Sequence, residues 1–153
     1  MSTINNDIVI LMADDDEDDR FMTQKAFKIN RLVNELRFVK DGQELMDYLY
    51  QRDKYSDPES APCPDLILLD LNMPRKDGRE ALREIKSDPV LHSIPVVILT
   101  TSNADKDVVH SYKLGVNSYI SKPVTFDGLV DVIRQIGLYW FQIVNLPKTT
   151  SDA

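Results

Sequence analysis

Two groups of carboxylates lie at the ends of apolar runs of the chain. Asp14 and Asp15 follow the run IVILMA (8–13), and Asp70 lies near the end of the run LILLDL (66–71). Carboxylates that crowd together resist simultaneous ionisation unless a cation joins them. Mg²⁺ suits such a place, because it binds one or two carboxylates together with water and phosphate oxygens. If these acids meet in the fold, the sequence predicts a site for a divalent cation.

A hydroxyl and an ammonium group are associated with two further apolar runs. Thr100 ends the run PVVILT (95–100), and Lys122 comes directly after SYIS (118–121). Carboxylate, Mg²⁺, lysine and hydroxyl together suit phosphoryl transfer, in which catalysis is mainly positioning and charge neutralisation. Asp70 would then be the nucleophile that accepts the phosphoryl group as an acyl phosphate.

The elements that must position these groups are five short apolar segments with helical patterns between them. We predict strands over 8–13, 36–39, 66–71, 95–100 and 118–121, and helices over 19–30, 42–51, 79–87, 105–114 and from Thr125 onward. Three of the strands are almost continuously apolar, as expected when helices cover both faces of a sheet. The alternation predicts an α/β fold with a parallel five-stranded sheet and right-handed crossovers.

In an open parallel sheet, ligands bind beyond the carboxyl ends of the strands. The residues that end or follow the predicted strands are Asp14, Asp15, Asp70, Thr100 and Lys122. They should therefore meet at one edge of the sheet, although they are far apart in sequence. Each has a structural explanation when taken alone, and the acids at 16–19 suit the first turn of a helix. The joint occurrence at four strand ends is what favours a functional site.

Composition and charge limit the class of protein. The chain has 153 residues, which suits one domain, and a net charge of −7, which argues against binding nucleic acid on its own. No apolar stretch approaches the length needed to cross a bilayer, and the first residues show no secretory signal. Cys63 is the single cysteine, which excludes an internal disulfide and a thiolate metal cluster. We expect a cytoplasmic protein with one domain over 1–147 and a disordered tail over 148–153.

Two stretches, 52–65 and 137–147, fall outside the alternating pattern, and a third segment has the composition of a turn. The stretch 52–65 holds three prolines and predicts a long surface connection. RKDGRE (75–80) has the composition of a turn, with Arg75 and Lys76 in solvent. The stretch GLYWFQIVNLP (137–147) is unusually aromatic.

This aromatic extension has two interpretations. It could fold back over the core of its own domain, or it could form an interface, since exposed aromatic patches mark interaction surfaces. We favour a symmetric homodimer that uses the extension and the last helix. The interface residues would be Tyr139, Trp140, Phe141 and Val144.

Four motifs resemble, in order, those of the response-regulator receiver domain. ILMADDDEDD resembles the acid pair at the end of the family's first strand, and PDLILLDLNMPRKDG its phosphoacceptor segment. PVVILTTS resembles its hydroxyl strand, and NSYISKPV its Tyr-x-x-Lys-Pro turn. The likeness covers almost the whole chain. It implies a (βα)5 flavodoxin-like fold with the strand order 2-1-3-4-5.

The resemblance implies the phosphoacceptor and the metal ligands. Asp70 would be phosphorylated by a partner histidine kinase. Asp15, Asp70 and the backbone carbonyl of Asn72 would hold Mg²⁺, with Asp14 acting through a coordinated water. Lys122 would pair with the carboxylate or with the phosphoryl group.

The resemblance also implies residues that respond to the phosphoryl group. Thr100 would move its hydroxyl to a phosphoryl oxygen, and Tyr119 would turn from an exposed to a buried position as a switch residue. Asn72 and Ser102 would flank the phosphoryl group and tune its hydrolysis. Pro123 would follow a cis peptide bond, a geometry that X-Pro bonds tolerate.

A narrower likeness is to the response regulators paired with cyanobacterial phytochromes. It is carried by the long loop before CPDLILLDLNMPRKDGREAL, by LTTS and YKLGVNSYISKPVTFDGL, and by the aromatic end YWFQIVNLP. These regulators are stand-alone receivers without a DNA-binding output domain. The likeness implies a phytochrome-type sensor kinase as partner, no output domain, and a phosphoacceptor signalling domain rather than an enzyme.

Three other functions compete with this interpretation. A phosphatase of the haloacid dehalogenase type needs a second aspartate two residues after its nucleophile, but position 72 is Asn, which has no proton to give. A flavodoxin-like redox protein would place the phosphate of FMN where six acids follow the first strand. A degenerate receiver would serve only as a binding module, and the joint presence of Asp15, Asp70, Thr100 and Lys122 argues against it.

Overall fold

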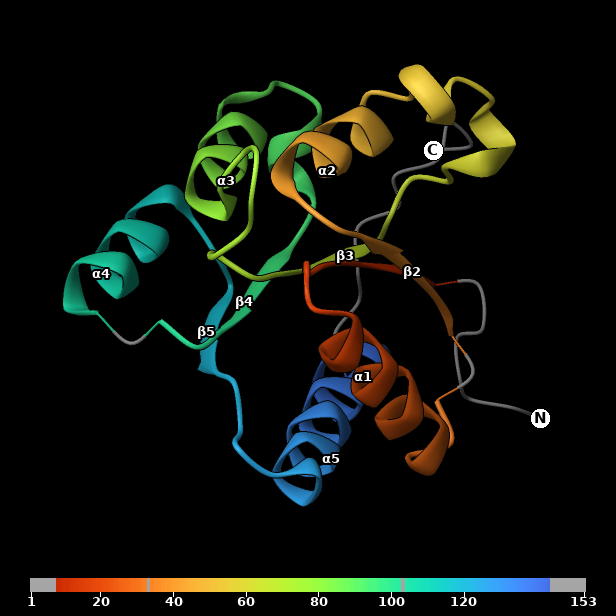
Figure 1. The fold of residues 1–153 in the computed structure, drawn as a ribbon, viewed down its shortest axis with the longest axis vertical. Coiled ribbons are helices and arrows are strands. Elements are labelled where there is room, and N and C mark those ends of the chain that lie inside the picture. The colour runs from red at the N-terminus through yellow and green to blue at the C-terminus, as the bar shows by residue number, and fades with distance from the viewer. Residues whose placement is uncertain (1–7, 33, 103, 144–153) are drawn as a thin grey trace.

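The computed structural model describes residues 8–32, 34–102 and 104–143, with side chains up to residue 140. Its strands form one parallel sheet in the order β2-β1-β3-β4-β5 (Figure 1). The strands are β1 (Val9–Ala13), β2 (Glu35–Val39), β3 (Leu66–Leu69), β4 (Val96–Thr100) and β5 (Ser118–Ser121). The predicted fold class and strand order are confirmed.

Helices alternate with the strands as predicted. They are α1 (Glu17–Ile29), α2 (Gly42–Leu49), α3 (Gly78–Ser87), α4 (Asp105–Leu114) and α5 (Phe126–Ile136). The α1 helix begins earlier than expected because Asp16 caps it, accepting a hydrogen bond of 2.8 Å from the amide of Asp18. Among the described residues, every helix is too short or too polar to span a lipid bilayer.

The sheet separates two hydrophobic clusters. Figure 1 shows α1 and α5 on one side of the sheet and α2 and α3 on the other. Leu45 and Leu82 belong to the cluster beneath α2 and α3, whereas Phe27 and Ile133 belong to the cluster beneath α1 and α5. The strands β1, β3 and β4 are buried along their whole length. Burial on both faces explains why their sequences are almost continuously apolar.

The aromatic extension continues α5 as a π-helix, Gly137–Ile143. Trp140 is only 7% exposed and belongs to the cluster beneath α1 and α5, so it is a core residue of its own domain rather than an exposed interface residue. The indole ring is large and mostly apolar, so removing it from water into this cluster is favourable. Leu138 and Tyr139 remain exposed. The side chain of Phe141, the whole of Val144 and the tail 148–153 lie outside the described part of the chain.

The long connection after α2 contains two short 3₁₀ helices, Asp53–Tyr55 and Pro58–Ser60. It is attached to the domain where the hydroxyl of Tyr48 donates a hydrogen bond of 2.7 Å to the carbonyl oxygen of Pro62. The predicted surface connection is therefore partly ordered by local helical turns.

Both basic residues of the loop between β3 and α3 are paired. Arg75 donates two hydrogen bonds to Asp41, of 2.9 and 3.2 Å, and Lys76 pairs with Glu84. The amide of Gly42 donates to the carbonyl oxygen of Lys76 at 2.9 Å. The Arg75 side chain is solvated as expected, at 62% exposed, although it pairs with Asp41. The expectation is wrong for Lys76, whose side chain is only 19% exposed beside Glu84 of α3.

The same loop folds back onto the end of β3. The amide of Gly78 donates to the carbonyl oxygen of Leu71 at 2.9 Å, and Asp77 caps α3 by accepting from the amide of Arg79 at 2.7 Å. A Cβ atom at position 78 would lie 2.2 Å from the carbonyl oxygen of Asp70. A glycine is therefore needed where the start of α3 meets the backbone of Asp70.

Replacing Gly78 by alanine should destabilise the fold, because the added methyl group must displace the backbone of Asp70. We expect a loss of about 1–3 kcal/mol in the free energy of unfolding, the range for an overpacked site. Urea denaturation measures this loss. Ser87→Ala, at the exposed end of the same helix, should change the same quantity by less than about 0.5 kcal/mol. Unchanged stability of Gly78→Ala would show that the loop relaxes around a methyl group.

Candidate functional site

The carboxyl ends of β1 and β3 bring three acids together. One carboxylate oxygen from each of Asp14, Asp15 and Asp70 lies within 4.8 Å of the other two. The sheet ladder extends just past the strands to hold them, since the amide of Asp70 donates to Ala13 and that of Asp14 to Val39, both at 3.0 Å. Asp14 and Asp70 are buried and Asp15 is exposed. The predicted meeting of these acids is confirmed.

Lys122 lies at the centre of this group. Its Nζ is 2.8 Å from a carboxylate oxygen of each of Asp14, Asp19 and Asp70. Its own amide donates to the carbonyl oxygen of Thr100 at 2.8 Å, which places the lysine at the end of β5 beside β4. Burial alone lowers the pKa of Lys122, but its hydrogen bonds to the three carboxylates raise that pKa above the usual range. The ammonium therefore stays charged at neutral pH.

Burial of Asp14 is the main electrostatic cost of the site. It raises the pKa of Asp14 to about 6, and the nearby charge of Asp70 adds to this rise, although Lys122 and the amide of Asp16 act in the opposite direction. The Oδ2 atom of Asp14 accepts no hydrogen bond of good geometry within the described residues, although it is ion-paired with Lys122. A buried carboxylate oxygen of this kind, beside two more acids, fits a hard divalent cation.

Thr100 and Asn72 both contact the Oδ1 atom of Asp70, whereas Lys122 contacts its Oδ2 atom. The hydroxyl of Thr100, which is fully buried, donates to Asp70 Oδ1 at 2.6 Å. The amide of Asn72 donates to the same oxygen at 3.2 Å. Lys122 donates to Oδ2 at 2.8 Å. Asp70 is thus held on both oxygens by groups that can stabilise negative charge.

Tyr119 reaches the site indirectly. It is half-buried, and its hydroxyl donates to the carbonyl oxygen of Ser102 at 2.8 Å. Its amide donates to the hydroxyl of Tyr112 at 3.1 Å. Tyr119 therefore connects β5 to the loop that follows Thr100, which is where a switch residue is expected.

The peptide bond before Pro123 differs from expectation. No cis peptide bond occurs among the described residues, so the Lys122–Pro123 bond is trans. The trans form is the lower-energy form of most X-Pro bonds.

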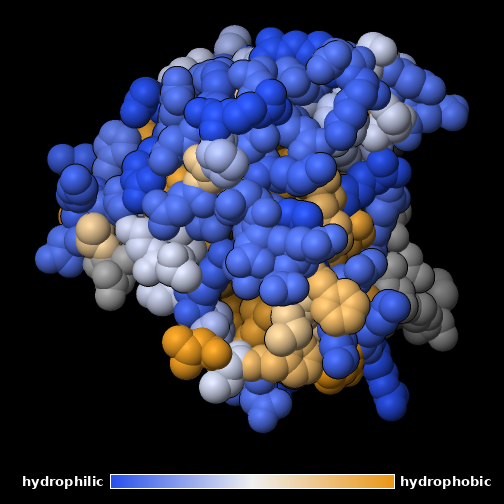
Figure 2. Space-filling model, viewed as in Figure 1, coloured by the Kyte–Doolittle hydropathy of each residue, from blue (hydrophilic) through white to orange (hydrophobic). Residues whose placement is uncertain are grey.

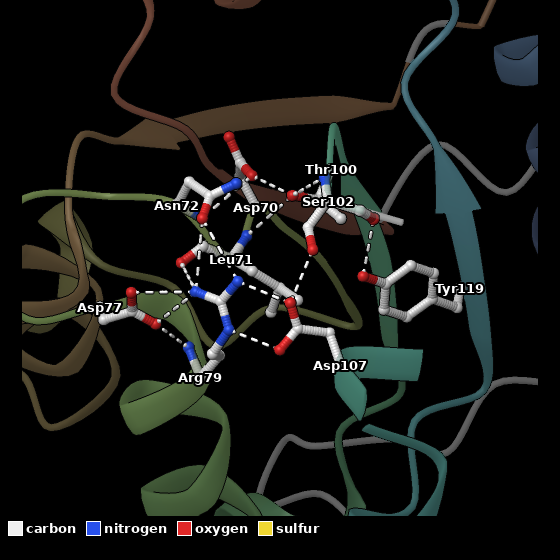
Figure 3. A network of polar contacts seen from close by, with 9 residues as sticks. All are labelled: Asp70, Leu71, Asn72, Asp77, Arg79, Thr100, Ser102, Asp107 and Tyr119. Carbon is white, nitrogen blue, oxygen red and sulfur yellow. Dashed lines mark hydrogen bonds and ion pairs between the residues drawn. The ribbon is translucent and has the colours of Figure 1, made fainter. Parts of the chain in front are cut away.

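Sequence reasoning missed three participants of this region. Asp19, interpreted as part of a helix start, is a direct partner of Lys122. Arg79 forms a bidentate ion pair with Asp107 and also reaches Asn72, while Asp107 accepts a hydrogen bond from Ser102 (Figure 3). One feature of the sequence pointed to Arg79. It comes directly after Gly78, at the start of a helix that faces the site.

Known proteins are similar in sequence to most of this chain. A sequence model described as "Response regulator receiver domain" matches residues 10–134. Response regulator Rcp1 of Synechocystis sp. is 43% identical over 139 residues, which cover 91% of this chain and 92% of Rcp1.

Two solved structures have a similar overall fold. The Mn²⁺-bound form of Rcp1 is similar with a TM-score of 0.84 and 42% identity, over 92% of this chain and 99% of that one. The phosphorylated cyanobacterial phytochrome response regulator RcpA is similar with a TM-score of 0.86 and 43% identity, over 93% and 99% of the two chains. The match of the sequence model over residues 10–134 and the identity with Rcp1 show that this chain belongs to the response regulator receiver domain family.

Proposed function

We propose that this protein is the Mg²⁺-dependent phosphoacceptor of a two-component phosphorelay, with Asp70 as the residue that is phosphorylated. The observation that carries the proposal is the environment of Asp70. Thr100 donates to one of its oxygens, Lys122 donates to the other, and Asp14 and Asp15 lie beside it. Family membership leaves no place for the phosphatase alternative, and the complete set of polar groups disfavours a degenerate receiver.

The transfer itself is a displacement at phosphorus. A carboxylate oxygen of Asp70 attacks the phosphorus of a phosphohistidine, a P–O bond forms, the P–N bond breaks, and the imidazole leaves with the bonding electrons. Lys122 neutralises charge on Asp70 and on the incoming phosphoryl oxygens. The protein acts only on its own carboxylate, as a signalling domain rather than as an enzyme with a separate substrate.

The metal ligands would be Asp14, Asp15, Asp70 and the backbone carbonyl of Asn72, with Asp14 acting through a bound water. Support comes from the three clustered acids and from the Mn²⁺-bound form of the relative Rcp1. When bound, Mg²⁺ supplies charge neutralisation for the phosphoryl oxygens.

Thr100 and Tyr119 would form the switch. When the hydroxyl of Thr100 leaves Asp70 for a phosphoryl oxygen, the loop that carries Ser102 must follow, because Ser102 is only two residues further along the chain. The hydroxyl of Tyr119 donates to the carbonyl of Ser102, so the tyrosine side chain must adjust as well. Phosphorylation would shift the population between these two arrangements and change partner binding.

The phosphoryl donor would be a sensor histidine kinase of the phytochrome type, acting in the cytoplasm. Support comes from the relative RcpA, a cyanobacterial phytochrome response regulator, and from RtBRR, a bacteriophytochrome response regulator with 39% identity and a TM-score of 0.73.

Asp70 should be the single residue that is phosphorylated. In the presence of Mg²⁺ and acetyl phosphate, the wild type should gain the mass of one phosphoryl group, and Asp70→Asn should gain none, because an amide is not a nucleophile for this reaction. Intact-mass spectrometry measures the gain. Asp131→Asn, at an exposed position of α5, is the control and should label like the wild type. A phosphate-sized gain that survives in Asp70→Asn would place the acceptor elsewhere.

Replacing one of the clustered acids should weaken Mg²⁺ binding, whereas replacing an acid at the start of α1 should not. Asp15→Asn removes a charged ligand and should weaken Mg²⁺ binding about tenfold or more, since even outer-shell changes cost roughly 10–100-fold. Asp18→Asn, exposed in the first turn of α1, makes the same change in charge outside the cluster and should leave the affinity nearly unchanged. Titration calorimetry compares the two. An equal loss in both would indicate general charge attraction rather than a site.

A homodimer through the aromatic extension and α5 is part of the proposal. Figure 2 shows hydrophobic side chains gathered over α1 and α5, whereas α2 and α3 present a mostly hydrophilic surface. Leu138 and Tyr139 are 45% and 53% exposed, and such apolar area favours association. Because Trp140 is buried, the exposed part of the extension would supply the interface.

Introducing charge at the exposed residues Leu138 and Tyr139 should separate the dimer into single chains. Leu138→Asp combined with Tyr139→Asp should lower the molar mass measured by light scattering to that of one chain. Val109→Asp, at a similarly exposed position of α4, is the control and should leave the molar mass unchanged. A wild type that already has the mass of one chain would refute the dimer.

A further inference from the structure

An ion pair between two helix starts borders the site. Arg79, the second residue of α3, donates to both carboxylate oxygens of Asp107, the third residue of α4, each at 2.7 Å. The Asp107 side chain is 8% exposed and that of Arg79 is 31% exposed. Bidentate pairs of this kind combine strength with fixed geometry. We call Arg79 and Asp107 the clamp.

One end of the clamp holds the loop after β4. The hydroxyl of Ser102 donates to Asp107 Oδ2 at 2.6 Å. The amide of Ser102 faces the hydroxyl oxygen of Thr100 at 3.4 Å, and its carbonyl oxygen accepts from Tyr119. Ser102 is thus fixed through its backbone on the side of Thr100 and through its hydroxyl on the side of the clamp.

The other end of the clamp holds the loop after β3. Both terminal nitrogens of Arg79 lie 3.3 Å from the side-chain oxygen of Asn72, and Nη1 is 3.4 Å from the carbonyl oxygen of Leu71. Arg79 also donates to Asp77. Since the amide of Asn72 donates to Asp70, a ring of polar contacts starts and ends at the phosphoacceptor (Figure 3). Its members are Asp70, Thr100, Ser102, Asp107, Arg79 and Asn72.

The clamp fixes the two side chains that border Asp70, through the side-chain oxygen of Asn72 and the hydroxyl proton of Ser102. Hydrolysis of an acyl phosphate needs a water whose oxygen forms a bond to phosphorus while the bond from phosphorus to the Asp70 oxygen breaks, with one proton released. A side-chain oxygen that accepts a hydrogen bond from this water orients it for attack. The oxygen of Asn72 is engaged by Arg79, and the hydroxyl of Ser102 is directed at Asp107.

We propose that Arg79 and Asp107 are positioning residues that prolong the lifetime of the phosphoryl group on Asp70 by holding the side chains of Asn72 and Ser102 away from the attacking water. This inference rests on the proposed function. Opening the clamp frees both side chains to orient a water, and hydrolysis becomes faster. Neither clamp residue contacts Asp70 itself.

The variant that opens the clamp must not leave a buried charge without its partner, because that alone destabilises a protein. Arg79→Ala combined with Asp107→Ala removes both charges together with the groups that hold Asn72 and Ser102. Arg83→Ala is the matched control, since Arg83 is exposed one turn further along the same helix. A second pair of proteins carries Asn72→Ala with Ser102→Ala, once with the clamp intact and once with the clamp opened.

The experiment measures the half-life of the phosphorylated proteins. Each is labelled with acetyl phosphate and Mg²⁺, freed of the reagent, and followed by intact-mass spectrometry. Opening the clamp should shorten the half-life about 3- to 10-fold, less than the roughly 10²–10⁴-fold of a fully positioned general base. Arg83→Ala should keep the half-life of the wild type. In the Asn72→Ala, Ser102→Ala background, opening the clamp should have no further effect.

Three outcomes would overturn the inference. They are an unchanged half-life, a longer half-life, and a shortening that persists when Asn72 and Ser102 are both alanine, which would indicate a general loosening of the fold. In each of these cases the wild type is still labelled on Asp70, so the proposed function stands. A wild type that takes up no phosphate would instead refute the proposed function and this inference with it.

Discussion

The site depends on one buried ammonium group that lies among carboxylates from three different segments. Lys122 contacts Asp14 at the end of β1, Asp19 in the first turn of α1 and Asp70 at the end of β3. Without this cation, the buried carboxylates of Asp14 and Asp70 would repel each other with no positive charge between them. A single positive charge does not balance the four acids around it once Asp15 is included. That deficit gives the edge of the sheet its attraction for a divalent cation.

This arrangement constrains the rest of the fold. The strands β1, β3 and β4 are buried on both faces, so their ends have little freedom, and the polar groups that follow them inherit that rigidity. The close approach of Gly78 to the carbonyl of Asp70 fixes the loop after β3 in the same way. Functional groups on loops gain precision when a rigid scaffold holds the loop ends. Here the scaffold is the sheet, the loops carry Asn72 and Ser102, and Arg79 lies in the first turn of α3.

Much of the fold and the main site residues could be predicted from the sequence. Continuous apolar runs identify buried parallel strands, and parallel strands must end on one edge, so the meeting of Asp14, Asp15, Asp70, Thr100 and Lys122 follows from topology. Residues on helices are harder, because the pattern of a helix does not tell how its axis lies over the sheet. Asp19 lies 103 positions before its partner Lys122, and Arg79 lies 28 before Asp107. The burial of Trp140 depends in the same way on where α5 directs the chain.

The position of Trp140 also decides what the protein's own fluorescence can report. It is the single tryptophan of the chain, and its indole lies in the hydrophobic cluster beneath α1 and α5. The ion pair of Arg79 with Asp107 links α3 to α4 instead, near the end of β4. A change in indole emission on phosphoryl transfer would therefore mean that the rearrangement has crossed to the α1 and α5 side, and a constant emission would place it among the loops at the edge of the sheet.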